Sequence, residues 1–463
     1  MNEIRFVAAQ GVAGAGVDAA ALEAALAYEP HFIACDGGTT DAGPFSLGSG
    51  EPAFARAAVK ADLAAMLAAG GRAGIPVLVG SAGTAGGAPH LAWAFEIVRE
   101  IVAESSRPLR VATVAAELDK ATLLALLRAG KVRALDPAPR FDAATIERSV
   151  RIVGMMGVEP LQAALALGAE LVLAGRCSDS ALFAALPIAR GFPAGLAWHA
   201  GKIAECGTLA CETAGPGVLV VTIRHDEAIV TPVGAGLRCT PVSVAAHSLY
   251  ENADPYRHVE CSGTLDLSAT TFSAVDERRV RVTGSAFEPA DEYTVKLEGA
   301  ERIGYQSLII GGIRDPYLIA RLDAWLATVR HAVETMTARL LGDQLGPQDY
   351  ALTFTVYGRD AVMGALEPLR DQPGHEVGIV FAATAPTQAL ATAIASFGRQ
   401  PLLHTPIPEW SGAITGFACL HNPAVLERGA VYRFNVNSVV VPPDPLALFP
   451  IAVHELEPAV TRA

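Results

Sequence analysis

The stretch HFIACDGGTTDAGP, residues 31–44, decides what kind of sheet this chain builds. The apolar run from Phe32 to Cys35 predicts a buried strand, which stops abruptly at Asp36 in a turn rich in glycine, threonine and aspartate. An ordinary turn is one explanation of that composition. A strand whose carboxyl end presents polar groups to a ligand is the other.

The same pattern recurs along the first third of the chain. Apolar strands are expected at IRFVAAQG (4–11), IPVLVG (75–80), LRVATVAA (109–116) and ELVLAG (170–175). Stretches rich in alanine and leucine separate them, and residues 51–74 predict one long helix that ends at Gly70 and Gly71. This alternation predicts a parallel sheet with helices on both faces, which binds ligands outside the carboxyl ends of its strands.

From about residue 217 the pattern changes. Short alternating strands rich in valine and threonine, such as GVLVVTIRHDEAIVTPV (217–233), indicate antiparallel pairing. Residues 315–341 predict a single long amphipathic helix, and further strands and a helix follow it. We therefore expect an α/β protein with two lobes. Residues 1–215 would form a parallel sheet with flanking helices, and residues 216–463 a mixed α/β lobe with antiparallel strands.

Composition narrows the class of protein. The chain has 463 residues, enough for more than one core, and 51% of them are apolar while only 18% are charged. That balance leaves little polar surface for a monomer, so we expect a homo-oligomer. The net charge of −13 argues against nucleic acid as a partner. No apolar run reaches the roughly 18–20 residues of a membrane span.

The start of the chain and its cysteines indicate a compartment. The sequence MNEIRFVAAQG lacks the basic and apolar regions of a signal peptide. Seven cysteines are scattered along the chain without a CxxC pair. This usage predicts reduced thiols and a cytoplasmic protein, because disulfide frameworks are rare there.

The turns after the first and second polar strand ends offer candidate site residues. Asp36 and Asp41 are candidates for a catalytic base or for ligands of a divalent cation such as Mg²⁺. The alternative is that they form a turn and a helix cap. The turn GSAGTAGG, residues 80–87, could offer backbone N–H groups to an anion, or could serve tight packing of strand and helix. The substrate-binding candidates of these two turns are Gly38, Thr39, Thr40, Ser81, Gly83 and Thr84.

No NAD or P-loop nucleotide signature is present, because the turn at 80–87 is neither GxGxxG nor GxxxxGK[ST]. The third strand end, GRCSDS (175–180), contributes Arg176 as a clamp for a carboxylate, with an internal acid as the alternative partner. Ser178 is a substrate-binding candidate. Asp179 is a catalytic candidate or a helix cap. Cys177 is either a nucleophile or a small buried residue.

Three later segments carry further candidates. In HAGKIAECGTLAC (199–211), Lys202 and Glu205 lie on one helix face with His199, as an acid/base pair or a surface ion pair. In HSLYENADPY (247–256), His247 and Tyr250 are substrate-binding candidates, with a solvated loop as the alternative. In YTVKLEGA (293–300), a lysine and a glutamate two residues apart share one strand face and predict a matched ion pair.

Five segments in this order resemble the acyclic terpene utilisation (AtuA-type) family: CDGGTTDAGP (35–44), LAGRCSDSALFAALP (173–187) and the three segments just quoted. The resemblance covers nearly the whole chain. It implies a place in catabolism of branched acyclic acids, in the company of acyl-CoA enzymes. Longer relatives carry a C-terminal ferredoxin-like domain. This chain shows no such appendage, so the resemblance implies a small ferredoxin-like companion subunit.

We expect an enzyme that acts on a small branched or hydroxy carboxylic acid or its CoA thioester, as a hydratase/dehydratase-type lyase. Such a reaction needs a base for the proton next to the carbonyl, an acid for the leaving hydroxyl and a clamp. The candidate catalytic residues are Asp36, Asp41, Asp179, Lys202 and Glu205. A non-catalytic acyl-CoA-binding or assembly subunit is the alternative. An acyl transferase that uses Cys177 would need a histidine beside the thiol.

Overall fold

A computed structural model describes residues 2–136, 140–408 and 416–459. The chain forms two compact units, the first made of Met1–Glu301 and Arg433–Ala463 and the second of Arg302–Tyr432. The sequence predicted a division after residue 215, where the strand pattern changes. The units divide elsewhere because the strands that follow residue 217 pair with the first strand of the chain and extend the same sheet.

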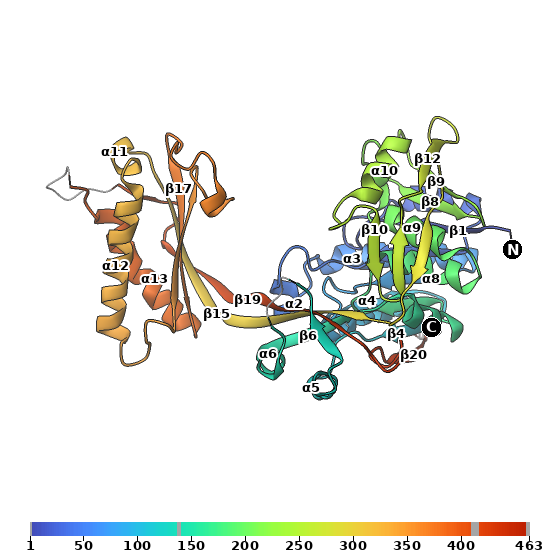
Figure 1. Cartoon of the computed structure of the whole chain (residues 1–463), viewed down its shortest axis with the longest axis horizontal. Helices are drawn as coiled ribbons and strands as arrows, with labels where there is room; N and C mark the ends of the chain where they lie inside the picture. Colours follow the sequence, from blue (N-terminus) through green and yellow to red (C-terminus); the bar gives the residue numbers. More distant parts are fainter. Residues whose placement is uncertain (1, 137–139, 409–415, 460–463) are drawn as a thin grey trace. The chain divides into compact units, whose positions relative to one another are not determined.

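The first unit is built on a ten-stranded sheet in the order β12-β13-β9-β8-β1-β2-β3-β7-β4-β20 (Figure 1). Its centre is parallel and consists of β1 (Ile4–Ala8), β2 (Phe32–Asp36), β3 (Val77–Gly80), β7 (Leu171–Ala174) and β4 (Leu109–Val114). All five predicted strands of the first third are therefore present. The predicted parallel sheet is confirmed.

Antiparallel strands extend this centre on both sides. On one side lie β8 (Val218–Ile223), β9 (Ala228–Val233), β13 (Val280–Thr283) and β12 (Thr271–Ala274). On the other side β20 (Ile451–Leu456) pairs antiparallel with β4. The predicted hairpin at 217–233 is present as β8 and β9, but it belongs to the first sheet rather than to a second lobe.

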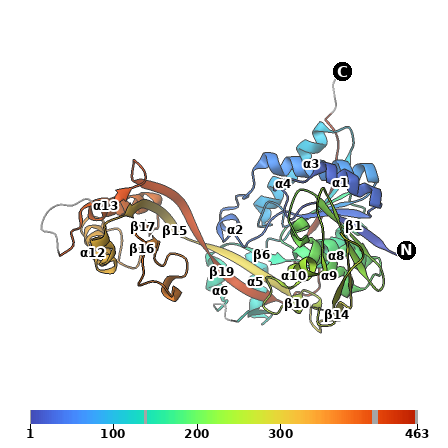
Figure 2. The same cartoon turned by 90° about the horizontal axis from the view of Figure 1, so that it is seen from above.

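Helices cover both faces of the parallel strands (Figure 2). Side chains of a strand alternate between faces, so Val7 and Ile33 pack with one set of helices while Phe6 and Phe32 pack with the other. The first set is α1 (Ala19–Ala25), α3 (Arg56–Ala73) and α4 (Ala88–Glu104). The second set is α7 (Val158–Ala166), α8 (Asp179–Ala189) and α9 (Ala194–Ala204). The helices α2 (Phe45–Ser49), α5 (Lys120–Arg128) and α6 (Ala143–Arg148) complete this part of the chain.

The predicted end of the helix at 51–74, at Gly70 and Gly71, came too early, because the helix ends at Ala73. Gly70 and Gly71 are helical, and α3 continues to Ala73. Gly74 has φ +66° and closes the helix with a backbone N–H bond to Gly70 O, because a left-handed residue is needed at that position. Gly70 lies against Val77, where a larger residue would meet the neighbouring strand.

Segments from the middle of the chain also belong to the first unit. Strands β10 (Arg257–Glu260), β11 (Gly263–Asp266) and β14 (Ala286–Pro289) form a small antiparallel sheet. Helix α10 (Pro241–Leu249) begins at a capping box between Thr240 and Ser243. The first part of β15 (Val295–Ile313) pairs with β6 (Ser149–Met155), which places Glu298 opposite Val153.

The second unit has its own core. Strands β16 (Ala351–Tyr357) and β17 (Val377–Ala385) pair antiparallel with each other, and β17 pairs with the distal part of β15. The long strand β19 (Val425–Val440) lies next to β15, and the short strand β18 (Ala418–Cys419) pairs with β15. The short strand β5 (Val132–Ala134) pairs with the end of β19, in residues that belong to the first unit. Helices α12 (Leu322–Leu341) and α13 (Gln388–His404) cover one face (Figure 1).

The single helix predicted at 315–341 is two helices. The short α11 (Pro316–Ile319) ends before Arg321, whose φ of −122° lies outside the helical region, and α12 starts afterwards. Among the described residues, no helix has both the length and the apolar character to cross a membrane.

Candidate functional site

Three loops meet at the carboxyl edge of the parallel strands. The strands β2, β3 and β7 are direct neighbours, so the turns that follow them lie side by side. Backbone hydrogen bonds join the turns: Gly37 N donates to Gly80 O at 2.7 Å, and Ser81 N donates to Gly175 O at 2.9 Å. The polar turns that follow these three predicted strands therefore share one edge of one sheet.

Glycines allow this close approach. Gly38, at φ +151°, lies against the backbone of Thr84, so a side chain at this position would collide with the second turn. Gly83 packs against His90 of α4, and the Thr84 hydroxyl accepts a hydrogen bond from Ala53 N at 2.9 Å. Gly38, Gly83 and Thr84 therefore hold the loops together, which favours the packing alternative for the turn at 80–87.

Arg176 lies at the centre of the first group of charges. Its Nε donates to Glu298 Oε2 at 3.0 Å, and its Nη1 donates to Ser81 Oγ at 3.2 Å. The same carboxylate accepts from Thr40 Oγ1 at 3.2 Å and from Lys296 Nζ at 3.1 Å. The internal-acid alternative for Arg176 is thus confirmed, and so is the ion pair predicted in YTVKLEGA.

Burial and charge act in opposite directions on two carboxyls of this group. Burial alone would raise the pKa of Glu298, but Arg176 and Lys296 outweigh it and lower the pKa to about 2. Asp36 is 4% exposed, and burial followed by the charge of Asp179 raises its pKa well above the ordinary value, against the effect of Arg176. Asp36 Oδ2 accepts from Gly38 N at 3.2 Å, whereas Oδ1 has no hydrogen-bond partner among the described residues.

Lys202 and Glu205 form a second group at the end of α9. Lys202 Nζ donates to Glu205 Oε1 at 2.6 Å, and Ser180 Oγ donates to Glu205 Oε2 at 2.8 Å. Both charged side chains are buried, so this is an interior pair and not the surface ion pair that was the alternative. The Lys202 ammonium lies 4.9 Å from the ring centre of Tyr250, whose hydroxyl is 3.4 Å from Cys206 Sγ.

Asp179 lies between the two groups. It is the first residue of α8, and its Oδ1 is 3.6 Å from Arg176 Nη1. Burial raises its pKa, and the charge of Asp41 adds to this, while Arg176 and Lys202 oppose it. The side chain is nevertheless 37% exposed. Asp179 is therefore one of the charged residues that a ligand can reach from solvent.

Glu260 completes the cluster and was not among the candidates from the sequence. It is the last residue of β10, and its Oε1 accepts from Ser178 Oγ at 3.2 Å. Burial, followed by the charges of Glu205 and Asp179, raises its pKa to about 8. Burial also raises the pKa of Glu205 to about 7, against Lys202. Two carboxyls of this cluster thus exchange protons near neutral pH.

The remaining candidates take different positions. Thr39 and Asp41 form a local turn in which Thr39 Oγ1 accepts from Asp41 N at 3.1 Å, and the Asp41 side chain is exposed. His247 is buried with its ring centre 5.0 Å from that of Tyr250, and burial together with Lys202 lowers its pKa to about 4. His199 faces Ser285 and Ser248 at 2.7 and 3.0 Å, which is a structural role.

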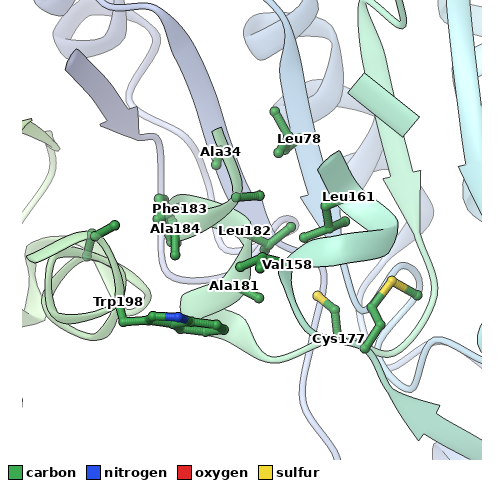
Figure 3. Packing of buried hydrophobic residues seen from close by; sticks show 14 of the residues in the cluster. Ala34, Leu78, Val158, Leu161, Cys177, Ala181, Leu182, Phe183, Ala184 and Trp198 are labelled. Atoms are coloured by element: carbon green, nitrogen blue, oxygen red, sulfur yellow. The ribbon is translucent and has the colours of Figure 1, made fainter. Parts of the chain in front are cut away.

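Cys177 belongs to the apolar core. Its side chain lies among residues of α7 and α8, including Val158 and Leu182 (Figure 3). Burial, Asp36 and Asp179 raise its pKa well above the ordinary value, whereas a nucleophile needs the thiolate. Within the described residues no histidine forms a hydrogen bond with this thiol. The acyl transferase alternative therefore lacks its base.

The described residues offer no ready set of ligands for the expected divalent cation. In the part of the chain that the structure describes, no three His, Cys, Asp or Glu side chains are grouped so that they could hold a metal ion. Asp36 and Asp41 are one buried and one exposed residue of the same turn. The metal stays a prediction.

We expect Glu260→Gln to stabilise the protein at alkaline pH. Because the pKa of Glu260 rises from 4.5 to about 8 on folding, the folded protein keeps a proton that the unfolded chain has released. The free energy of unfolding of the wild type should therefore fall between about pH 5 and about pH 8, by on the order of 2 kcal/mol for this half-buried group.

The neutral glutamine can accept the Ser178 hydrogen bond without this loss. Urea unfolding at about pH 5 and about pH 8 tests the expectation. The variant should match the wild type at the lower pH and exceed it at the higher one. If the free energy of unfolding had the same pH dependence in the wild type and the variant, the proton could not be assigned to Glu260.

Comparison with protein families places this geometry in context. Residues 48–407 match the family model described as acyclic terpene utilisation family protein AtuA. The matched range includes Arg176, Asp179, Lys202, Glu205 and Glu260. The chain has no significant match among curated proteins or among solved structures.

Proposed function

The chain belongs to the acyclic terpene utilisation (AtuA) family, and from this premise we propose that it is a catabolic lyase of the hydratase/dehydratase type. Its substrate class is a small branched or hydroxy carboxylic acid or the CoA thioester of one. The observation that carries the proposal is the placement of two carboxyls at the start of α8, where Ser180 holds Glu205 and Ser178 holds Glu260. Lys202 contacts Glu205, and burial raises the pKa values of the two carboxyls to about 7 and about 8.

Glu205 is the proposed base. A carboxylate with a pKa near the working pH can take a proton from the carbon next to a carbonyl and return it in the reverse reaction. Ser180 and Lys202 each hold one of its oxygens, so the carboxyl group has a fixed orientation. The ammonium of Lys202 supplies positive charge where the enolate would form.

Glu260 is the proposed acid. With a pKa of about 8 it carries its proton at neutral pH, and it can give that proton to the hydroxyl that leaves. Ser178 donates to one oxygen of this carboxyl and so leaves the other for the substrate. Two carboxyls that both hold and release protons near neutrality suit a reversible hydration.

Arg176 and the residues around it form the proposed binding site for the substrate carboxylate. Glu298 already neutralises Arg176 through Nε, so the clamp is weaker than the sequence predicts. The 3.6 Å between Nη1 and Asp179 is too long for a hydrogen bond, and a substrate carboxylate can compete for this position. The exposed part of Asp179 supports entry of the ligand at this point.

We expect Asp36→Asn to fold normally and to lose ligand binding or turnover. The carboxyl is buried and burial raises its pKa, so an isosteric neutral amide should cost the fold little. An amide cannot release a proton or take up negative charge when a ligand binds. Circular dichroism checks the fold and ligand titration checks binding. A misfolded variant, or one with full function, would remove Asp36 from the site.

Proton NMR in D₂O tests the function itself. The purified chain would be mixed with hydroxy acids, unsaturated acids and their CoA thioesters, with and without the proposed ferredoxin-like companion. Deuterium next to a carboxyl group, or a new vinyl signal, is the expected result. If no mixture shows deuterium incorporation or a vinyl signal, but the ligand lines still broaden when protein is added, the result would favour the alternative.

That alternative is a non-catalytic acyl-CoA-binding or assembly subunit of a catabolic complex. The tight glycine packing of the strand-end turns and the neutralisation of Arg176 by Glu298 are the observations in its favour. Under it, acid-to-amide changes would alter affinity only. A homo-oligomeric state and the companion subunit remain proposals that size-exclusion chromatography and co-purification can test. A cytoplasmic location remains a proposal that cell fractionation can test.

A further inference from the structure

Two cysteine side chains meet outside the charged cluster. Cys211 follows the short helix η2 (Gly207–Ala210), and Cys239 precedes the capping residue of α10. Their Sγ atoms are 3.6 Å apart, and the residues are 6% and 1% exposed. Both are free thiols. Nothing in the proposed reaction uses them.

The backbone keeps the two thiols adjacent. Glu212 N donates to Arg238 O at 2.9 Å, and Ser243 Oγ donates to Ala210 O at 2.9 Å. The side chains of Glu212 and Arg238 form an ion pair next to the cysteines. Because contacts on both sides fix the segments, a bond between the sulfurs needs an approach of only about 1.5 Å, to the usual length of ~2.05 Å.

The two thiols differ in reactivity. The hydrogen bond from Cys239 lowers the pKa of Cys211, and the charge of Arg278 adds to this, although burial opposes both. The three residues that follow Cys211 are exposed, so a small reagent can reach this segment from solvent. Cys211 is therefore the sulfur that attacks first.

We propose that Cys211 and Cys239 form a reversible disulfide by exchange with a small-molecule disulfide of the glutathione class. The Cys211 thiolate attacks one sulfur of oxidised glutathione, forms a mixed disulfide and releases one glutathione thiolate. Cys239 loses its proton to solvent and attacks Cys211 Sγ, which releases the second glutathione thiolate. The cysteine pair gives up two electrons and two protons, and one glutathione disulfide becomes two thiols.

The bond would join two segments that hold site residues. The chain runs from Cys211 back through η2 to Cys206, and from Cys239 forward through α10 to Tyr250. Cys206 Sγ and the Tyr250 hydroxyl are already 3.4 Å apart. The disulfide would therefore tether the position of the Tyr250 ring relative to Lys202.

Thiol mapping of the intact protein tests the proposal. The reduced chain is incubated with oxidised glutathione and then unfolded in urea with iodoacetamide, which alkylates all remaining thiols, and peptides are analysed by mass spectrometry. We expect a cross-link between Cys211 and Cys239, with the other five cysteines alkylated, including Cys206 on the same tryptic peptide as Cys211. Reduced glutathione should remove the cross-link.

Variants sharpen this test. Cys211→Ser and Cys239→Ser should each abolish the cross-link, and the matched control Cys419→Ser, in the second unit, should keep it. The peptide map of the wild-type protein tests the proposal even if a variant does not fold. Alkylation of all seven cysteines, a cross-link between other cysteines, or a glutathione adduct on Cys211 that Cys239 does not displace would each overturn the proposal. None of these results depends on the lyase activity.

Discussion

Replacement of Glu298 with alanine should lower the free energy of unfolding by about 3–5 kcal/mol. The change removes the carboxylate that accepts from Arg176 Nε at 3.0 Å and leaves a guanidinium that is 5% exposed. Ser81 offers only a neutral oxygen, and Asp179 is 3.6 Å away. A buried charge without its partner is costly. Urea unfolding followed by circular dichroism measures the loss.

Lys296→Ala is the matched control. Lys296 donates to the same carboxylate at 3.1 Å, but its side chain is 43% exposed, so its removal should cost at most about 1 kcal/mol. Equal effects of the two changes would mean that Arg176 does not depend on Glu298. The pH dependence of the free energy of unfolding gives an independent check on the role of Glu298. The folded pKa of Glu298 lies below its unfolded value of 4.5, so its stabilisation is complete above about pH 4.5 and is lost as the pH falls toward 2.

Glu205→Gln should lower kcat of the proposed reaction by about 10²–10⁴-fold. The amide oxygen can still accept from Lys202, and the amide NH2 can donate to the Ser180 hydroxyl, so the fold should survive, but the amide cannot take a proton from carbon. The initial rate of deuterium incorporation in D₂O is the measurement. The wild-type rate should also fall below about pH 7, because the base becomes protonated there.

Glu212→Gln serves as the control for this change. Glu212 is close in sequence and forms an ion pair with Arg238, but its side chain is 50% exposed and it lies outside the charged cluster. It should keep the wild-type rate and pH profile. A folded Glu205→Gln protein with unchanged turnover would exclude Glu205 as the base.

Local patterns along the sequence were enough to predict the parallel sheet and its polar edge. Each strand near the site is a short apolar run that ends in glycine and polar residues, so these patterns alone assign Asp36, Ser81 and Arg176 to one edge of the sheet. The order of the strands, which makes the three turns direct neighbours, comes only from the structure. The periodicity of Lys202 and Glu205 likewise predicted that they share a helix face.

Glu260 and the role of Glu298 could not be predicted in this way. Glu260 ends a short strand of a separate three-stranded sheet, and no motif marks it. Glu298 reaches Arg176 because β15 pairs with β6, which is a contact between residues far apart in the chain. The division into lobes failed for the same reason, since a change of strand pattern at 217 does not reveal which sheet the new strands join.

The pairing of β20 with β4 has a consequence for biosynthesis. A ribosome releases β4, residues 109–114, early, and β20, residues 451–456, only after the whole of the second unit. Until then the N–H and C=O groups on one side of β4 have no strand to pair with, and such an edge can recruit strands of other nascent chains. The ten-stranded sheet can therefore be completed only after the second unit has been synthesised, and until then the open edge of β4 is accessible to strands of other chains.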